Sequence, residues 1–444
     1  SKAYQTLGDA IEKIGHRLTG SPNGKKAEEY AFNLLKSYGY QVKYQPFEVE
    51  SWSRGEVETK VGNSSLMKKI KSVTLAHSPV KANVEADLVD MGNGLDEDYQ
   101  NNPGKVKDKI ALVYLGILPG SKSGLSNLHR SEKTAIATKN GAVGIIIFNT
   151  VQGGVLLTGT ASVTGKLIPI PAVCIGLEDG MKLKDELKTE ALKASISMTN
   201  FSGMIKARNV IATLKGSKYP KEKIVVGGHL DSWDLATGAI DNGIGSFSVL
   251  DMARTFAKLN LHPKRTIEFM MFMGEEEGLL GSTNYVKEAV KDGSINDVKY
   301  MLNYDMSNDP KGYGSTSATS KDLFQSVGAI AADIDTSFKN IYNGGAGLHS
   351  DHQPFMLLGI PIGSDAGGSL PNNSGRCYHA DCDNFDLVDE QGMKNTVRFN
   401  SMLIYALADV NKIPAVRMTD TETRDFLIKN NLKEALQIAG EWRW

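Results

Sequence analysis

The sequence predicts an α/β protein whose doubly wound, mostly parallel sheet is interrupted by an inserted β-rich domain. Short apolar runs at Ile224–Val226, Ile267–Met273 and Tyr300–Tyr304 are bounded by glycine and polar turns, as is typical of buried parallel strands. Apolar residues between the first two runs repeat at the spacing of one helix face: Phe247, Leu250, Ala253 and Ala257. Strands and helices therefore alternate over residues 204–444, whereas residues 66–203 contain many short apolar runs separated by Gly and Ser turns.

Residues 1–65 are predicted to form the N-terminal part of the α/β domain. Residues 3–18 and Pro22–Tyr38 have the pattern of two helices. Ser21 can cap the second of these, and the proline that follows it suits a first helical position. The run Gln41–Val49 then alternates between polar and apolar residues, which predicts a strand.

Residues 66–203 are predicted to form the inserted domain. Its strand-like runs are Lys109–Tyr114, Gly141–Phe148 and Ile168–Ile175. Its helix-like segments are Lys133–Asn140 and Glu178–Leu187. The α/β pattern resumes at residue 204 and continues to residue 444, so the chain is expected to return to one domain after the insertion.

The last stretch of the chain, Thr419–Trp444, is helix-prone and ends with Trp442 and Trp444. Two exposed tryptophans at a terminus would be unusual. We therefore expect this tail to dock on the body of the protein or on a second subunit, which leaves a homodimer as an open alternative.

Composition and charge exclude several classes of protein. Apolar content of 41% and charged content of 23% are ordinary for a globular protein. The net charge of −1 gives no indication of a nucleic-acid or anionic-membrane partner, and the absence of any run of 18 apolar residues argues against a membrane span. The chain starts at Ser1 without Met, and the sequence does not distinguish a cleaved targeting segment from a trimmed chain. We expect an exported protein, secreted or periplasmic, in preference to a cytoplasmic one.

Imidazole and carboxylate side chains occur near the ends of the three strands. They are His229, Asp241, Glu275, Glu276 and Asp305. In open α/β sheets the reactive groups gather at the carboxyl ends of the strands, so we expect these side chains to converge. Imidazole with carboxylate suits zinc, and other divalent metals can substitute. Because crowded carboxylates repel one another unless cations neutralise them, the sequence predicts a metal site, and two ions sharing one carboxylate are a recurrent arrangement.

Each of these residues also has a purely structural interpretation. The run Glu275–Glu277 could be the acidic first turn of a helix, and Asp241 could be a helix N-cap. A balanced pair of metal sites needs one more imidazole, for which the candidates are His349, His352 and His379. A lone histidine is more often structural than a ligand.

Several motifs resemble a known family. They are His229-x-Asp231, Asp241-Asn242, Glu275-Glu276, Asp305 and His379-x-x-x-Asp383. In this order they resemble the ligand series of the di-zinc exopeptidases, the family of bacterial leucyl aminopeptidases and plasma glutamate carboxypeptidase (carboxypeptidase Q). The likeness extends to Gly15–Ser21 and to Gly216–Asp241, and so spans most of the chain. It implies the zinc exopeptidase version of the α/β fold.

The resemblance also implies a role for each residue. One zinc would be held by His229, Asp241 and Asp305. The other would be held by Asp241, Glu276 and His379, with Asp241 as the bridge. Glu275 would be the general base. Asp231 would orient the imidazole of His229 by accepting its other N–H, and Asp383 would do the same near His379. His349 and His352 are expected to form a wall of the cleft and not to bind metal.

The order of elements in residues 66–203 resembles the protease-associated domain, a β-rich insertion beside the active site of several peptidases of this family. The alternative is a substrate-shaping insertion of other ancestry. No cluster of ligand-like residues falls within this range. The insertion is therefore expected to shape access to the site and not to perform chemistry.

Three cysteines do not make a disulfide scaffold. Cys174 lies in an apolar run and is expected to be a small buried hydrophobe. Cys377 and Cys382 flank His379, and they could be bonded, be inert thiols or compete for zinc. We favour a bond or inert thiols over ligation.

The function predicted from these observations is zinc-dependent hydrolysis of the terminal peptide bond of dipeptides or short peptides. Aminopeptidase or dipeptidase action is favoured because the site is rich in acids that suit a free amine. A metallocarboxypeptidase is the alternative, and Arg376 is the candidate cation for a terminal carboxylate. A non-catalytic receptor and a single-zinc aminoacyl cyclase are further alternatives on the same scaffold.

Overall fold

The computed structural model describes residues 1–63 and 66–444, and these form two compact units. The first, which we call the α/β unit, consists of Ser1–Val49, Lys206–Gly375 and Asp383–Leu432. The second, which we call the insertion unit, consists of Glu50–Ile205, Arg376–Cys382 and Lys433–Trp444. Each unit is described below by itself.

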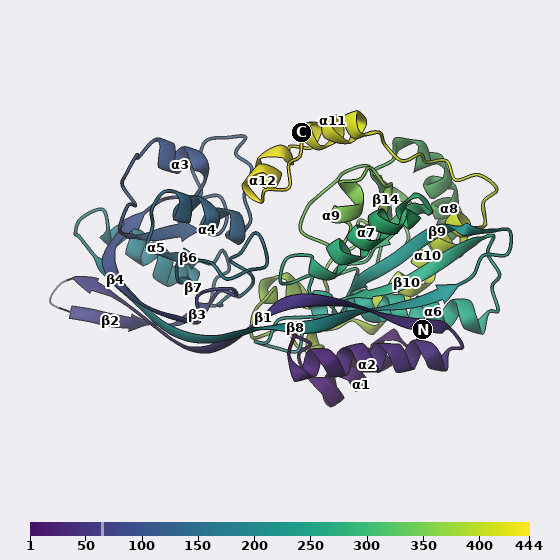
Figure 1. The fold of residues 1–444 in the computed structure, drawn as a ribbon, viewed down its shortest axis with the longest axis horizontal. Helices are drawn as coiled ribbons and strands as arrows, with labels where there is room; N and C mark the ends of the chain where they lie inside the picture. Colours follow the sequence, from purple (N-terminus) through teal and green to yellow (C-terminus); the bar gives the residue numbers. More distant parts are fainter. Residues whose placement is uncertain (64–65) are drawn as a thin grey trace. The chain divides into compact units, whose positions relative to one another are not determined.

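The α/β unit contains a sheet with helices on both faces. Its helices are α1 (Ala3–Ile14), α2 (Pro22–Ser37), α6 (Ile244–Lys258), α7 (Leu280–Asp292), α8 (Lys321–Ile334), α9 (Gln353–Met356), α10 (Glu390–Asp409) and α11 (Asp420–Lys429). Its strands are β9 (Tyr219–His229), β10 (Arg265–Phe272), β11 (Val298–Asn303), β12 (Gly312–Ser315), β13 (Ile341–Asn343) and β14 (Ile362–Ala366), with parts of β1 (Gln41–Asn63) and β8 (Lys193–Leu214). In Figure 1, α1, α2 and α6 lie on one side of this sheet, and α7 and α9 lie on the other.

The strand order of the α/β unit is β13-β12-β14-β11-β9-β10-β8. The central pairs β10/β9, β11/β9 and β11/β14 are parallel, whereas β12/β14 and β10/β8 are antiparallel. Every residue of β10 is buried, which explains why that strand reads as a nearly continuous apolar run. The mostly parallel α/β fold predicted from the sequence is confirmed.

The register of the central strands brings their carboxyl ends together. Phe272 at the end of β10 pairs with His229 at the end of β9, and Asn303 at the end of β11 pairs with Gly227. The residues that follow Phe272 and Asn303 therefore leave the sheet at the same edge as His229.

The N-terminal helices differ in length from the prediction. The first ends at Ile14 and does not reach residue 18, because Gly15 has a left-handed φ of 79° and the chain turns into a loop. The second begins at Pro22 as expected, and the Ser21 hydroxyl accepts a hydrogen bond from the Gly24 amide at 3.0 Å. The strand expected over Gln41–Val49 continues to Asn63, because its second half pairs with β2.

The insertion unit is built around a second group of strands. Its strands are β2 (Leu66–Ile70), β3 (Ser72–Thr74), β4 (Lys81–Asp90), β5 (Ile110–Tyr114), β6 (Gly144–Phe148) and β7 (Ala172–Ile175), with parts of β1 and β8. Its helices are α3 (Asp96–Gln100), α4 (Arg130–Lys139), α5 (Leu177–Glu186) and α12 (Lys433–Ile438). The order β8-β4-β5-β6-β7-β3 has parallel pairs in the middle, and a separate apolar core includes Leu112, Ile146 and Val173.

The end of the C-terminal tail, Lys433–Trp444, belongs to the insertion unit, whereas α11 belongs to the α/β unit. Helix α12 contacts α4, and its Leu436 side chain is buried. The rings of Trp442 and Trp444 meet edge to face with centroids 5.0 Å apart. Over the part of the chain that the structure describes, no helix combines the length and apolar character needed to cross a bilayer.

Candidate metal centre

The ends of β9, β10 and β11 bring one imidazole and several carboxylates into a buried cluster. The Nε2 atom of His229 lies 3.3 Å from Asp241 Oδ1, 3.5 Å from Asp305 Oδ1 and 3.9 Å from Glu275 Oε2. The possible ligand atoms form two groups, and within each group all the atoms lie within 4.8 Å of one another. His229 belongs to both groups. One adds Glu275 and Asp305, and the other adds Asp241 and Glu276.

The turn that presents Asp241 lies between β9 and α6. Its peptide bond to Asn242 is cis. The carboxylate of Asp383 accepts hydrogen bonds from the amides of Ile240 at 2.7 Å and Asp241 at 3.0 Å. The side chain of Asn242 donates to the Tyr304 carbonyl at 3.0 Å, so the turn is attached to the end of β11.

Asp383 was expected to orient His379, and the structure shows a different use of its carboxylate. Both oxygens hold the backbone at Asp241. Burial raises the pKa of Asp383 to about 6, although the two amide hydrogen bonds and Arg17 oppose that rise. Asp383 therefore positions the candidate bridging residue.

Asp231 contacts the imidazole through its backbone. The Nδ1 atom of His229 lies 3.1 Å from the Asp231 carbonyl oxygen and 3.7 Å from its carboxylate. The carboxylate instead accepts hydrogen bonds from the amides of Glu275 and Glu276, both at 3.4 Å. Asp231 thus links the candidate ligand on β9 to the pair of glutamates after β10. The Nδ1 contact directs Nε2 toward the cluster, an arrangement common to metal-binding histidines.

The electrostatics of the cluster favour a cation. Burial raises the pKa of Glu275 well above its usual value, and the nearby charges of Asp305 and Glu276 raise it further. Burial by itself lowers the pKa of His229, but Glu275 and Asp305 outweigh it and raise that pKa well above the usual range. Among the described residues, the buried Oδ1 atom of Asp305 accepts no hydrogen bond. A buried carboxylate oxygen without a donor, beside an imidazole, fits the donor set of a zinc site.

His379 and Arg376 lie on a segment of the insertion unit. The Nδ1 atom of His379 lies 3.0 Å from Arg130 Nη2 and 3.2 Å from the Thr158 carbonyl. Cys377 and Cys382 form a disulfide, which excludes them as thiolate ligands and closes a short loop around His379. Arg376 is exposed, and Cys174 is buried and free.

Arg17 supports the site, which the sequence did not indicate. This fully buried arginine donates hydrogen bonds to the carbonyls of Leu230 at 2.6 Å, Thr237 at 2.8 Å and Gly238 at 2.8 Å. Its neighbour Thr19 donates to the Asp231 carboxylate at 3.1 Å. Burial lowers the pKa of Arg17 to about 10, which leaves it charged at neutral pH, and nearby carboxylates oppose that shift. The loop after α1 therefore holds the segment between His229 and Asp241.

We expect Arg17→Met to lower the free energy of unfolding by about 3 kcal/mol or more, because each buried carbonyl that loses its donor costs about 1–3 kcal/mol. Urea unfolding of zinc-free protein measures this, since metal loss then makes no contribution. Lys13→Met on α1 is the control, because Lys13 is exposed and pairs only with Asp9 on the same helix. Equal stability of the two variants would contradict the supporting role of Arg17.

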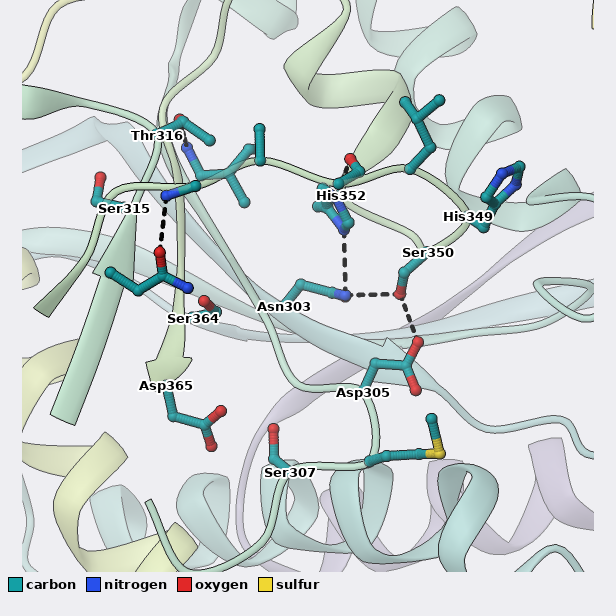
Figure 2. Close-up of a pocket in the computed structure, with 17 residues that line it drawn as sticks. Asn303, Asp305, Ser307, Ser315, Thr316, His349, Ser350, His352, Ser364 and Asp365 are labelled. Carbon is teal, nitrogen blue, oxygen red and sulfur yellow. Dashed lines mark hydrogen bonds between the residues drawn. The ribbon is translucent and has the colours of Figure 1, made fainter. Parts of the chain in front are cut away.

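A pocket of about 470 Å³ opens beside the cluster within the α/β unit (Figure 2). Asp305 is part of its lining, as are His349 and His352. Ser350 donates a hydrogen bond of 2.7 Å to Asp305 Oδ2 and receives one of 2.7 Å from Asn303. The structure therefore places the two histidines in a pocket wall, and the pocket reaches a candidate metal ligand.

The chain is similar to known families over both of its parts. Residues 209–404 match the model of peptidase family M28, and residues 84–183 match that of the PA domain. A probable leucine aminopeptidase 2 of Aspergillus oryzae is 29% identical over 365 residues, which cover 78% of this chain and 68% of the relative. Carboxypeptidase Q of Xenopus laevis is 26% identical over 429 residues, which cover 93% of this chain and 87% of the relative.

Solved structures show the same fold. A peptidase M28 precursor from Shewanella amazonensis superposes with a TM-score of 0.79 at 24% identity and covers 94% of this chain and 96% of its own. An aminopeptidase from Aneurinibacillus sp. strain AM-1 gives 0.68 at 27% identity, with 94% and 95% coverage. A zinc aminopeptidase from Bacillus subtilis gives 0.68 at 23% identity, with 95% and 96% coverage.

Proposed function

We propose that this chain is a metallo-exopeptidase that uses two zinc ions to remove amino-terminal residues from dipeptides and short peptides. Its matches to the models of peptidase family M28 and the PA domain, and its likeness to aminopeptidases, support this proposal. The observation that carries this proposal is the convergence of His229 with the carboxylates at the ends of three strands. In this arrangement, His229, Asp241 and Asp305 would hold one zinc, and Asp241 and Glu276 would hold the other. His379 as a further ligand of the second zinc stays a prediction from the family resemblance.

Glu275 is the residue that we assign to proton transfer. Bound zinc would supply Lewis acidity to the scissile carbonyl and to the attacking water. The Glu275 carboxylate would take a proton from that water and later deliver it to the leaving amine. Burial raises the pKa of Glu275 above its usual value, and a positioned carboxylate can act in turn as base and as acid.

The charges of the pocket favour recognition of a free amine. Its described lining contains the carboxylate of Asp305 at the metal cluster and includes no lysine or arginine. An ammonium group would gain charge-assisted hydrogen bonds there, whereas a terminal carboxylate would find no cation. The relatives carry both aminopeptidase and carboxypeptidase names. Which end of the peptide the enzyme cleaves therefore needs a direct test.

We expect acetylation of a dipeptide's amino terminus to reduce kcat/KM by about 100-fold or more, and amidation of its carboxyl terminus to reduce it far less. The physical reason is the loss of charge-assisted hydrogen bonds from the ammonium, each of which contributes about 1.5–3 kcal/mol. Steady-state hydrolysis by the zinc-loaded protein measures both effects. Activity that survives acetylation and disappears on amidation would make the enzyme a carboxypeptidase, and Arg376→Ala would then be the next variant to measure.

Two alternatives make different predictions. A non-catalytic receptor needs no general base, whereas this chain has Glu275 inside the cluster. A single-zinc aminoacyl cyclase would bind one metal per chain. The disulfide between Cys377 and Cys382 supports our proposal that the protein works outside the cytoplasm, because such bonds persist in oxidising compartments. Homodimer formation stays a prediction.

A further inference from the structure

The pocket beside the metal cluster has a mixed lining that suits a long side chain with a charged end. Met306, Leu348 and Ile362 give it apolar walls. Hydroxyl and amide groups occupy much of the rest, as Figure 2 shows for Ser307, Ser315 and Asn303 among others. Lysine and arginine combine an aliphatic stem with a cationic head, and they pack the stem against apolar surface while the head stays in a polar environment.

Asp365 provides a carboxylate that this cationic head could contact. Its side chain lines the pocket and keeps some accessible surface there, although protein surrounds it. Asn400 donates to it at 3.3 Å, and Ser307 donates a second hydrogen bond, with the carboxylate turned toward that hydroxyl in Figure 2. Within residues 1–63 and 66–444, no lysine, arginine or histidine forms an ion pair with it.

The environment of Asp365 lacks a compensating charge from the protein itself. Burial raises the pKa of Asp365 to about 6, and the hydrogen bonds from Asn400 and Ser307 only partly oppose this rise. The carboxylate is therefore largely ionised at neutral pH, although it is deep in the pocket. An ionised group in such a place is stabilised when a cation enters.

The strand register places Asp365 within reach of a residue bound at the metal cluster. Leu302 of β11 pairs with Gly363 of the parallel strand β14, and neighbouring strands lie about 4.8 Å apart. Asp305 follows Leu302 by three positions and Asp365 follows Gly363 by two. Asp305 therefore lies just past the end of β11, and Asp365 lies within the neighbouring strand β14, near its carboxyl end. Both line the pocket, and a side chain as long as lysine or arginine can extend from one toward the other.

We infer that this pocket selects peptides whose amino-terminal residue is lysine or arginine, and that Asp365 is the specificity-determining residue. The inference rests on the proposed aminopeptidase function, because the side chain enters the pocket only if its own ammonium and carbonyl lie at the metal cluster. The described lining also includes Ser364 and Asn343, which offer polar contacts and supply no competing cation.

The test compares Lys-Ala and Arg-Ala with norleucyl-Ala, which has an uncharged straight side chain. For the zinc-loaded full chain we expect kcat/KM to be about tenfold to hundredfold higher for the basic substrates, the range for a hydrogen-bonded charge pair. Asp365→Asn keeps the shape and the Asn400 contact. It should bring the ratio close to one by lowering kcat/KM for the basic substrates. Asp365→Glu should keep part of the preference, and Asp333→Asn, an exposed aspartate on α8, should keep all of it.

A binding measurement separates this inference from the proposed function. Calorimetry with free L-lysine and L-norleucine reports the pocket's preference without turnover. If no substrate is hydrolysed but L-lysine binds more tightly and Asp365→Asn removes the difference, the proposed function fails and the pocket assignment stands. Equal treatment of basic and neutral substrates by the unmodified protein would overturn the assignment. A higher kcat/KM for basic than for neutral substrates that persists in Asp365→Asn would also overturn it. So would a preference for lysine or arginine that appears only when the basic residue is carboxyl-terminal, as in Ala-Lys and Ala-Arg.

Discussion

Glu275→Gln is expected to reduce kcat by about 10²–10⁴-fold while the zinc content stays unchanged. Proton transfer by a positioned carboxylate contributes about that factor, and glutamine keeps the shape of the side chain but cannot accept the proton. The Glu275 carboxylate already lies among the candidate ligands, 3.9 Å from His229 Nε2, and our assignment leaves it outside both zinc sites. Steady-state kinetics and elemental analysis of the same preparation measure the two quantities together.

The neighbouring glutamates provide matched controls. Glu277 follows the pair in sequence and is buried, and it belongs to neither group of possible ligands. Glu277→Gln should therefore leave kcat within a few-fold. Glu276→Gln should instead lower the zinc content. If Glu275→Gln lost zinc and Glu276→Gln lost only turnover, the roles of the two glutamates would be reversed.

Asp241→Asn is expected to remove most zinc from both sites and to abolish measurable activity. A bridging carboxylate is shared by two cations, and an amide supplies neither its charge nor its second strong donor oxygen. We expect about two zinc ions per chain in the unmodified protein and fewer than one in the variant. Zinc added at about 1,000 times its Kd stabilises a single-site protein by about 4 kcal/mol, so the zinc-dependent rise in unfolding temperature should also disappear.

His349→Ala is the control for this second prediction. His349 lines the pocket but is absent from both groups of possible ligands, so its variant should keep about two zinc ions. A clean value of one zinc in the unmodified protein, unchanged by added zinc, would contradict the dinuclear centre and favour the cyclase alternative.

The candidate site could be located from the sequence because its residues follow the strands directly. His229 ends β9, Glu275 follows β10 and Asp305 follows β11. Apolar runs indicate buried strands, and the carboxyl ends of parallel strands lie at the same edge of a sheet. The three segments that follow these strands could therefore be placed together before any contact between them was known. The same reasoning predicted the α/β fold, and the matches to the models of peptidase family M28 and the PA domain agree with the resemblance found in the sequence.

Contacts that depend on three-dimensional placement could not be predicted in this way. The role of Arg17 depends on a loop that turns at Gly15 and directs the guanidinium to carbonyls far along the chain, and no periodic pattern encodes such a contact. Asp231 was identified from the sequence, but the atom that contacts His229 is its backbone carbonyl oxygen. Every residue has such an acceptor, so the residue type could not predict this contact. Asp365 lies near the end of β14, and the neighbours of that strand are set by the order of the sheet.

The hydrogen bonds of Arg17 can form only after more than half of the chain has been synthesised. Arg17 and Leu230 are 213 positions apart, so at a synthesis rate of about 5–20 residues per second the arginine leaves the ribosome roughly 10–40 s before its first acceptor. Glu275 and Asp305 follow later still. The first half of the chain has neither the base nor a complete set of ligands. A nascent chain therefore cannot hydrolyse peptides until its second half has been made.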